Sequence, residues 1–525
     1  MKKIGFIIAA LFIAIVTMAY LYFSGLSSEH KKTQHSLYVA AAHSPLIFSF
    51  ENEQSIVDIL KGQNVLQDLI GEEKIDQLTA LTNNVLGVPG VQKFFERQSV
   101  YISLHPGDNK SFSFLYSTQI NPDFTTEQLL QTLAIGKVVL TPDLGIFKMS
   151  LNDSTNFFIG MEGNLLLLST ESKLVKRGLT VSRDQQNKFA EFIQANSRIA
   201  KTSLAELYLN IEKLPHLLKV MMPGKLPVEL TTLDRQNAYA ALVYNFSKEK
   251  VLLTGTTVPQ SSGNYYSIFA NETSQKIDIT NILPDNTAIY TAYAVANHLS
   301  FRRALKQWFK ENQEVKEIDK TIENINTTNR IDLEKVLPAY FRNQFITFQL
   351  SSSEKLAAVN LTNGDKLDQL LLELSTNYSD EIKRLKVAGL LYAFFGEPFR
   401  NFQRPYYLII DNYMIIANSP ETLASFSHSY RNNELLINNG DFSNAVEQLS
   451  AGSNIEVYVD FKNSANIAQK NIYLPFFRHI YSKEGLKDYS SLSYQLSSDN
   501  KKFLTNLLMV KKQAISAPDS LSIMK

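Results

Sequence analysis

The sequence predicts an α+β protein: two tandem homologous domains, each an antiparallel sheet with helices packed on it, preceded by one N-terminal transmembrane helix. Three observations predict this class, namely an uncharged apolar run at the amino end, a repeat at an offset of about 250 residues, and strands that alternate apolar and polar side chains. A chain of 525 residues is also too long for a single hydrophobic core.

The apolar run extends from Ile4 to Phe23 and contains no charged residue. At about 1.5 Å per residue, a helix of this length reaches about 30 Å, the thickness of a bilayer's hydrocarbon core. Tyr20, Tyr22 and Phe23 lie at its distal end, where aromatic side chains favour the membrane interface. A cleaved secretory signal is the alternative, but its apolar region usually spans about 7 to 15 residues and ends in a small-x-small site.

Positive charges on the two sides of this run predict its orientation. Lys2 and Lys3 adjoin it on the amino side, whereas Lys31 and Lys32 lie farther away on the other side. The positive-inside rule therefore predicts a cytoplasmic N-terminus and a periplasmic or extracellular ectodomain. The expected localisation is that of a single-pass membrane protein.

Composition limits the partners of this ectodomain. The chain has 52 basic and 51 acidic residues, so it lacks the electrostatic footprint of a nucleic-acid-binding protein. It contains no cysteine, which excludes a disulfide framework and a cysteine metal site. Hydrophobic residues make up 44% of the chain, which suits folded domains rather than a disordered stalk.

An internal duplication organises the ectodomain. SLAELYLNI at 203–211 matches SNIEVYVDF at 453–461, and YAALVYNFS at 239–247 matches YSSLSYQLS at 489–497, both at an offset of 250. Because a repeat decides the domain organisation, it takes precedence over the assignment of single elements.

Further segments follow the same order. Residues 157–174 and 406–423 share the pattern strand, polar turn, strand and helix start, at an offset of 249. Weaker similarity links the segment that begins at Tyr38 with a predicted strand at Tyr290, and SVYISLHP near 99 with QFITFQLS near 344. The resulting domain boundaries are an anchor at 1–24 with its helix at 4–23, a juxtamembrane linker at 25–35, repeat domain one at 36–262, a linker at 263–282, repeat domain two at 283–512, and a mobile tail at 513–525.

The duplication also singles out one acidic and one aromatic position. Glu206 and Tyr208 recur as Glu456 and Tyr458, and period-two alternation places each pair on one face of its strand. One hypothesis is that each pair forms equivalent polar contacts in a binding groove. The alternative is an exposed sheet face with ordinary cross-strand pairing.

A second candidate binding surface is the aromatic segment 391–410, which carries Arg400 and Arg404. Aromatic side chains beside arginine are typical of protein interfaces. A buried hairpin with its connector is an equally good explanation.

Motifs for chemistry are missing from the sequence. It has no G-x-S-x-G elbow, no phosphate-binding P-loop, no H-E-x-x-H helix and no EF-hand loop. The sequence therefore predicts no catalytic residue, no metal site and no cofactor.

Two α+β copies in a signal-anchored chain, each with the strand ELYLNI or EVYVDF after a helix, resemble uncharacterised two-repeat ectodomain proteins of Bacteroidota in a domain-of-unknown-function family. That resemblance implies an envelope location and no established activity. The expected function is that of a non-catalytic binding or scaffolding module, held in the membrane by Ile4 to Phe23, with another envelope protein as partner and no nucleic acid. The alternatives are a carrier of a lipid or other apolar ligand and a carboxylate-dependent hydrolase.

Overall fold

The computed structural model describes residues 35–52, 72–107, 111–136, 138–150, 156–182, 186–197, 205–224, 236–245, 250–482 and 485–512. The predicted membrane segment, Ile4 to Phe23, and the predicted tail, 513–525, lie outside these residues.

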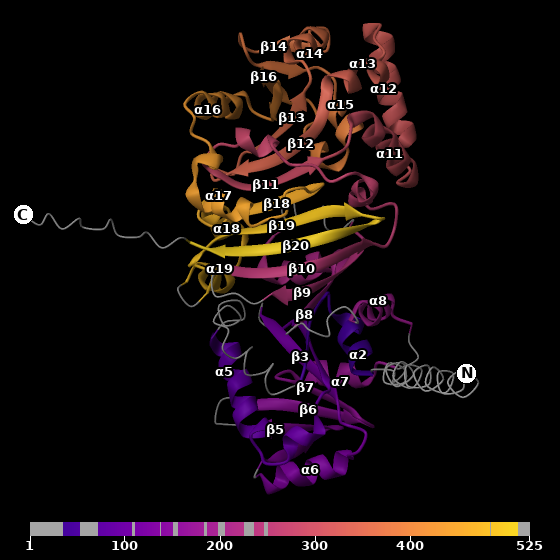
Figure 1. Ribbon diagram of the computed structural model, residues 1–525, viewed down its shortest axis with the longest axis vertical. Coiled ribbons are helices and arrows are strands. Elements are labelled where there is room, and N and C mark those ends of the chain that lie inside the picture. The colour runs from indigo at the N-terminus through magenta and orange to yellow at the C-terminus, as the bar shows by residue number, and fades with distance from the viewer. Residues whose placement is uncertain are drawn as a thin grey trace, which may run out of the picture.

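In the described part of the chain, twenty strands form one continuous sheet in which every pairing is antiparallel. Figure 1 shows the strands stacked along the long axis of the molecule, with β10 and β20 meeting near its middle. The strands of the first half are β1 (Leu46–Glu51), β2 (Ser99–Pro106), β3 (Phe112–Gln119), β4 (Leu140–Asp143), β5 (Ile146–Ser150), β6 (Asn156–Glu162), β7 (Leu165–Ser169), β8 (Glu206–Asn210), β9 (Ala238–Asn245) and β10 (Lys250–Pro259). Those of the second half are β11 (Thr287–Ala294), β12 (Phe341–Leu350), β13 (Lys355–Leu361), β14 (Ser375–Asn377), β15 (Lys383–Leu385), β16 (Tyr406–Ile410), β17 (Tyr413–Ala417), β18 (Ile455–Asp460), β19 (Tyr489–Asp499) and β20 (Lys502–Lys511).

The two halves have the same strand order. In the first half the neighbours run β4-β5-β6-β7-β3-β2-β1-β8-β9-β10. In the second half they run β14-β15-β16-β17-β13-β12-β11-β18-β19-β20. The last strand of each half, β10 and β20, pair with each other and join the halves. The repeat in the sequence thus corresponds to a repeat in topology.

The predicted fold class is nevertheless wrong in its division into two domains. The pairing of β10 with β20 extends over eight residue pairs, from Lys250 with Val510 to Thr257 with Phe503, so the two sheets are one. Residues 263–282, predicted to be a linker, also pack into the second half. Tyr265 and Phe269 are buried there, and the Tyr265 hydroxyl donates to the Phe395 carbonyl at 2.5 Å.

The prediction of a single-pass membrane protein with a signal anchor is also contradicted. Within the residues that the structure describes, no helix is both long and apolar enough to cross a membrane.

Helices cover both faces of the sheet. The first half contains α2 (His35–His43), α5 (Glu72–Leu81), α6 (Thr126–Ile135), α7 (Ser172–Leu179), α8 (Lys188–Asn196) and α9 (Leu214–Leu218). The second half contains α11 (His298–Glu311), α12 (Val315–Asn329), α13 (Leu333–Tyr340), α14 (Gly364–Leu371), α15 (Leu390–Phe395), α16 (Pro420–Arg431), α17 (Gly440–Glu447), α18 (Ala465–Asn471) and α19 (Leu474–Tyr481). The helices α2, α7 and α8 lie on the same face as α16 and α17, whereas α11 to α15 cover the other face of the second half.

Local sequence explains where these helices begin. Thr125 and Gln128 form a capping box at the start of α6, and Ser419 caps α16 with Pro420 in its first turn. One predicted correspondence fails locally, because the segment at Tyr38 forms the helix α2 and not a strand. The strand that occupies the place of β11 in the first half is instead β1.

Candidate functional site

In the first half, Glu206 and Tyr208 are in direct contact at the edge of a core. Both lie on β8 with their side chains on one face, and the Tyr208 hydroxyl donates to a Glu206 carboxylate oxygen. Tyr208 is buried among residues of α2 and α8, while Glu206 is half-buried. Burial raises the pKa of the Glu206 carboxyl, and the bond from Tyr208 opposes this effect.

In the second half, the recurring glutamate has a different partner. Glu456 on β18 is only 6% exposed and accepts a hydrogen bond from the Tyr290 hydroxyl of β11 at 2.6 Å. Gln495 on β19 donates to its other oxygen at 3.4 Å. Burial is the main cause that raises the pKa of the Glu456 carboxyl. Glu456 is therefore an interior hydrogen-bond acceptor rather than the wall of an open groove.

Tyr458 packs beside this carboxyl without bonding to it. Its ring stacks on Tyr290 with centroids 5.3 Å apart and meets Phe442 of α17 edge-on at 5.1 Å. The buried Tyr458 side chain lies directly opposite Ser493 of β19 in the sheet register. The polar partner of Glu456 is thus Tyr290 on the neighbouring strand β11, whereas that of Glu206 is Tyr208 on its own strand.

The two glutamates share one row of the sheet. Successive strand pairings lead from Glu206 across to Glu456, and the central pair of this row joins β10 to β20. The row consists of Glu206, Val243, Thr254, Asn506, Gln495 and Glu456. Residues directly opposite each other in a sheet point to the same face, so both carboxyls lie on one face, about 24 Å apart across five strand spacings.

The row is symmetric about the pair Thr254 and Asn506, because it crosses equivalent strands of the two halves in the same order on either side of that pair. The cross-strand partners of the two glutamates are not equivalent in the sequence repeat. The partner of Glu206 is Val243, 37 positions later (243 − 206), whereas the partner of Glu456 is Gln495, 39 positions later (495 − 456). The difference of two residues is one pleat period, so it leaves every side chain on its original face.

Arg400 belongs to a network inside the second half. Its guanidinium contacts Glu314 at 3.1 Å and Glu397 at 3.0 Å, donates to the Tyr392 hydroxyl, and lies 4.3 Å from the centroid of the Tyr392 ring. Arg404, by contrast, is exposed. The structure therefore separates the two arginines that the sequence groups as one surface.

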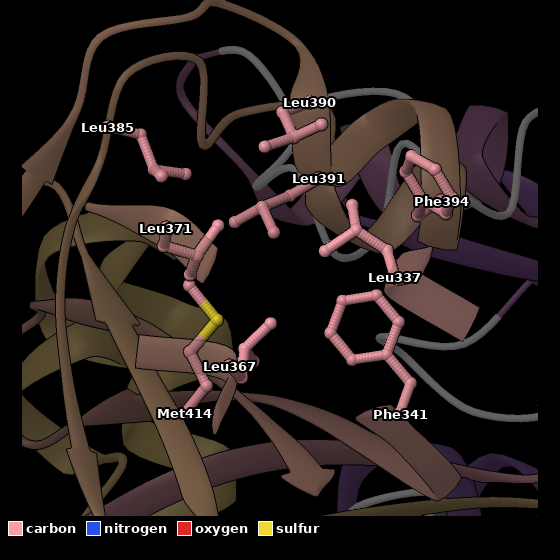
Figure 2. Close-up of a pocket in the computed structure, with 9 residues that line it drawn as sticks. All are labelled: Leu337, Phe341, Leu367, Leu371, Leu385, Leu390, Leu391, Phe394 and Met414. Carbon is pink, nitrogen blue, oxygen red and sulfur yellow. The ribbon is translucent and has the colours of Figure 1, made fainter. Parts of the chain in front are cut away.

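An enclosed apolar cavity lies between the helices and the sheet of the second half (Figure 2). Its volume is about 10 Å³, far below the several hundred cubic ångströms that a lipid would need. The lining residues are Leu337, Phe341, Leu367, Leu371, Leu385, Leu390, Leu391, Phe394 and Met414.

One open cleft was not anticipated from the sequence. It has a volume of about 390 Å³ and is lined by His43, Pro45, Pro106, Glu212, Lys213, His216 and Leu217. The two histidines are far apart in the chain, so the sequence gives no local pattern that joins them. The one local indication of this cleft in the sequence is the segment from Glu212 to His216 with its charged residues. Among the described residues, no group of three or more histidine, aspartate and glutamate side chains is placed to hold a metal ion.

Comparisons with known proteins give no match to a family model, to a curated protein or to a solved structure.

Proposed function

We propose that this chain is a non-catalytic scaffold that binds a protein partner on the face of its central strands. The observation that carries the proposal is a band of half-buried or exposed side chains on β9, β10 and β20, here called the central floor. It consists of Ala241, Val243, Thr254, Thr256, Leu504 and Asn506.

The central floor lies between two helices that cover its neighbours. On one side α8 packs on β9 through Phe189 and Tyr239, whose ring centroids are 5.1 Å apart. On the other side α17 packs on β19, and its Phe442 also packs against Tyr458 of β18. The floor carries no charged side chain, and Leu504 is 50% exposed. A neutral and partly apolar surface of this kind suits a protein partner better than a polyanion.

The placement of the recurring glutamates supports a binding role over a hydrolytic one. A carboxylate pair that hydrolyses a bond needs both groups within about 5 to 10 Å in one cleft. Glu206 and Glu456 are about 24 Å apart by strand spacing, and each is occupied by a tyrosine hydroxyl.

Site-specific photo-crosslinking tests this proposal. A benzophenone amino acid at Leu504 should give a discrete adduct in extract of the source cells, and Thr254→Arg should abolish that adduct without changing the unfolding transition. The control position is Leu144, which is 89% exposed at the turn between β4 and β5. Identical adducts from both positions, or none from Leu504, would contradict the proposal.

A further inference from the structure

The open cleft of the first half lies where three strands end. β1 begins immediately after Pro45, β2 ends at Pro106, and β8 continues into the turn Ile211–Lys213 and the short helix α9. This corner is well defined, because the Asn210 amide donates to the Pro45 carbonyl at 2.8 Å and the Ser44 hydroxyl donates to the Leu104 carbonyl at 2.9 Å. The cleft is therefore built on strand ends that are fixed by hydrogen bonds.

Side chains with nitrogen donors predominate in its lining. Lys213, His43 and His216 line the cleft and are exposed, against one acidic side chain, Glu212. Burial lowers the pKa of His43, and the nearby charges of Arg177 and Lys213 lower it further. That effect indicates that two permanent cations lie close to the imidazole.

His105 is not part of this lining although it precedes Pro106. It is 4% exposed and hydrogen-bonded to Ser103 at 2.9 Å, and its pKa is lowered to about 4, mainly by burial. The groups that face the cleft are therefore the exposed ones.

The second half provides an internal comparison at its corresponding corner. Asn463 occupies the place of Lys213, 250 residues later. Its side-chain amide donates to the carbonyls of Asp285 and Thr287 at 2.8 and 2.9 Å, and its backbone amide donates to Asp460 at 2.8 Å. The two copies of this corner thus differ, because a hydrogen-bonded asparagine in the second half stands where the first half has an exposed lysine.

We propose that the open corner binds a small phosphate dianion, either inorganic phosphate or a phosphate monoester. Lys213 supplies the main charge, as lysine does for phosphate in many sites, and the imidazoles of His43 and His216 donate hydrogen bonds. Glu212 accepts from a hydroxyl of the ligand, which favours a hydroxylated monoester over free phosphate. The volume of about 390 Å³ is in the range of small-molecule sites.

Calorimetric titration of the full chain with inorganic phosphate and with glycerol 3-phosphate tests this site. Saturable binding of at least one of them is expected. Lys213→Asn installs the residue that the second half uses at this place, so the protein should fold, and it should weaken binding about tenfold or more.

Lys219→Asn is the matched control, because this exposed lysine lies six residues later and outside the lining. It should leave the affinity unchanged, and Glu212→Gln should reduce the preference for glycerol 3-phosphate. Tighter binding of glycerol 3-phosphate identifies the monoester class, and equal binding identifies phosphate itself. Failure of both ligands to saturate, or equal weakening by Lys213→Asn and Lys219→Asn, would overturn the proposal.

Discussion

Ionisation of the buried Glu456 carboxyl should destabilise the folded state. Its carboxyl is buried and hydrogen-bonded to Tyr290, and burial raises its pKa. A raised pKa in the folded state stabilises the protonated form, so the stability that this group contributes is present below the unfolded pKa of about 4.3 and is lost as the pH rises through the folded pKa.

The variant Glu456→Gln should therefore gain stability relative to the natural chain as the pH rises from about 4 to about 7, because an amide does not ionise. Urea unfolding at both pH values measures the difference. Glu434→Gln, at an exposed position, is the control and should show little change. A difference between Glu456→Gln and the natural chain that does not vary with pH would contradict this explanation.

The buried His298 should give the opposite dependence of the unfolding free energy on pH. It packs against the rings of Phe301, Phe341 and Phe395 at the start of α11. Its pKa is lowered to about 3, first by burial and then by the charge of Arg302. A lowered pKa means that the stability from this group is present above the unfolded value of about 6.5 and is lost as the pH falls through the folded value.

Replacement of His298 by phenylalanine should reduce the acid sensitivity of the protein by up to about 1.4 kcal/mol per pH unit below about pH 6.5. The slope of unfolding free energy against pH is the measurement, and His428→Gln at an exposed site is the control. An unchanged slope in His298→Phe would show that the imidazole is not held neutral.

Among the elements, the connection between α11, α12 and α15 depends on Arg400. This side chain joins Glu314 before α12, Glu397 after α15, and the ring of Tyr392. Arg400→Ala should cost about 1 to 3 kcal/mol, since it leaves partly buried charged partners unsatisfied.

Arg400→Lys should restore only part of that loss, because an ammonium lacks the planar guanidinium donors. Arg404→Ala, at an exposed residue of the same segment, should change the unfolding free energy by less than about 0.5 kcal/mol. Chemical denaturation of the three variants is sufficient, and equal effects at positions 400 and 404 would contradict the network.

Gly255 in β10 lies against the backbone of β9. A Cβ atom there would lie 2.0 Å from the Ala241 carbonyl oxygen of β9, which forces the backbone to move. Gly255→Ala should destabilise the protein by about 1 to 3 kcal/mol. Gly440→Ala makes the same substitution at the start of α17, where nothing lies within 4 Å, and should be neutral or slightly stabilising.

Hairpins and their helices are the elements that the sequence predicts best. The pattern of strand, turn, strand and helix start at 157–174 and 406–423 corresponds to β6, β7 and α7 and to β16, β17 and α16. The secondary structure of the segment HSLYVAAAH is harder to predict, because a short apolar run has no periodicity that distinguishes a buried helix from a strand. Burial of Glu456 was also hidden, since its partner Tyr290 lies 166 residues away.

At the scale of the whole molecule, the decisive event is the pairing of two edges. Each half ends in a strand of ten residues with an unpaired edge, and such an edge is a template for another strand. In this chain the two equivalent edges meet each other, which turns two repeats into one sheet with an approximate two-fold relation. Pairing between strand edges is made by backbone groups, so the pattern of side chains in the sequence does not reveal it. The sequence therefore predicts the repeat correctly, but the predicted division into two domains is wrong.

The pairing of β10 with β20 can be measured directly, because the natural chain contains no cysteine. Thr254 and Asn506 are opposite residues, and Cα atoms of opposite residues in antiparallel strands lie about 4.5 to 5.5 Å apart, within disulfide range. The double variant Thr254→Cys and Asn506→Cys should form an internal disulfide on mild oxidation and keep its unfolding transition. The pair Thr254→Cys and Val510→Cys, displaced by four residues, should remain reduced. Equal oxidation of both pairs, or none at Thr254 and Asn506, would contradict a single sheet joined at β10 and β20.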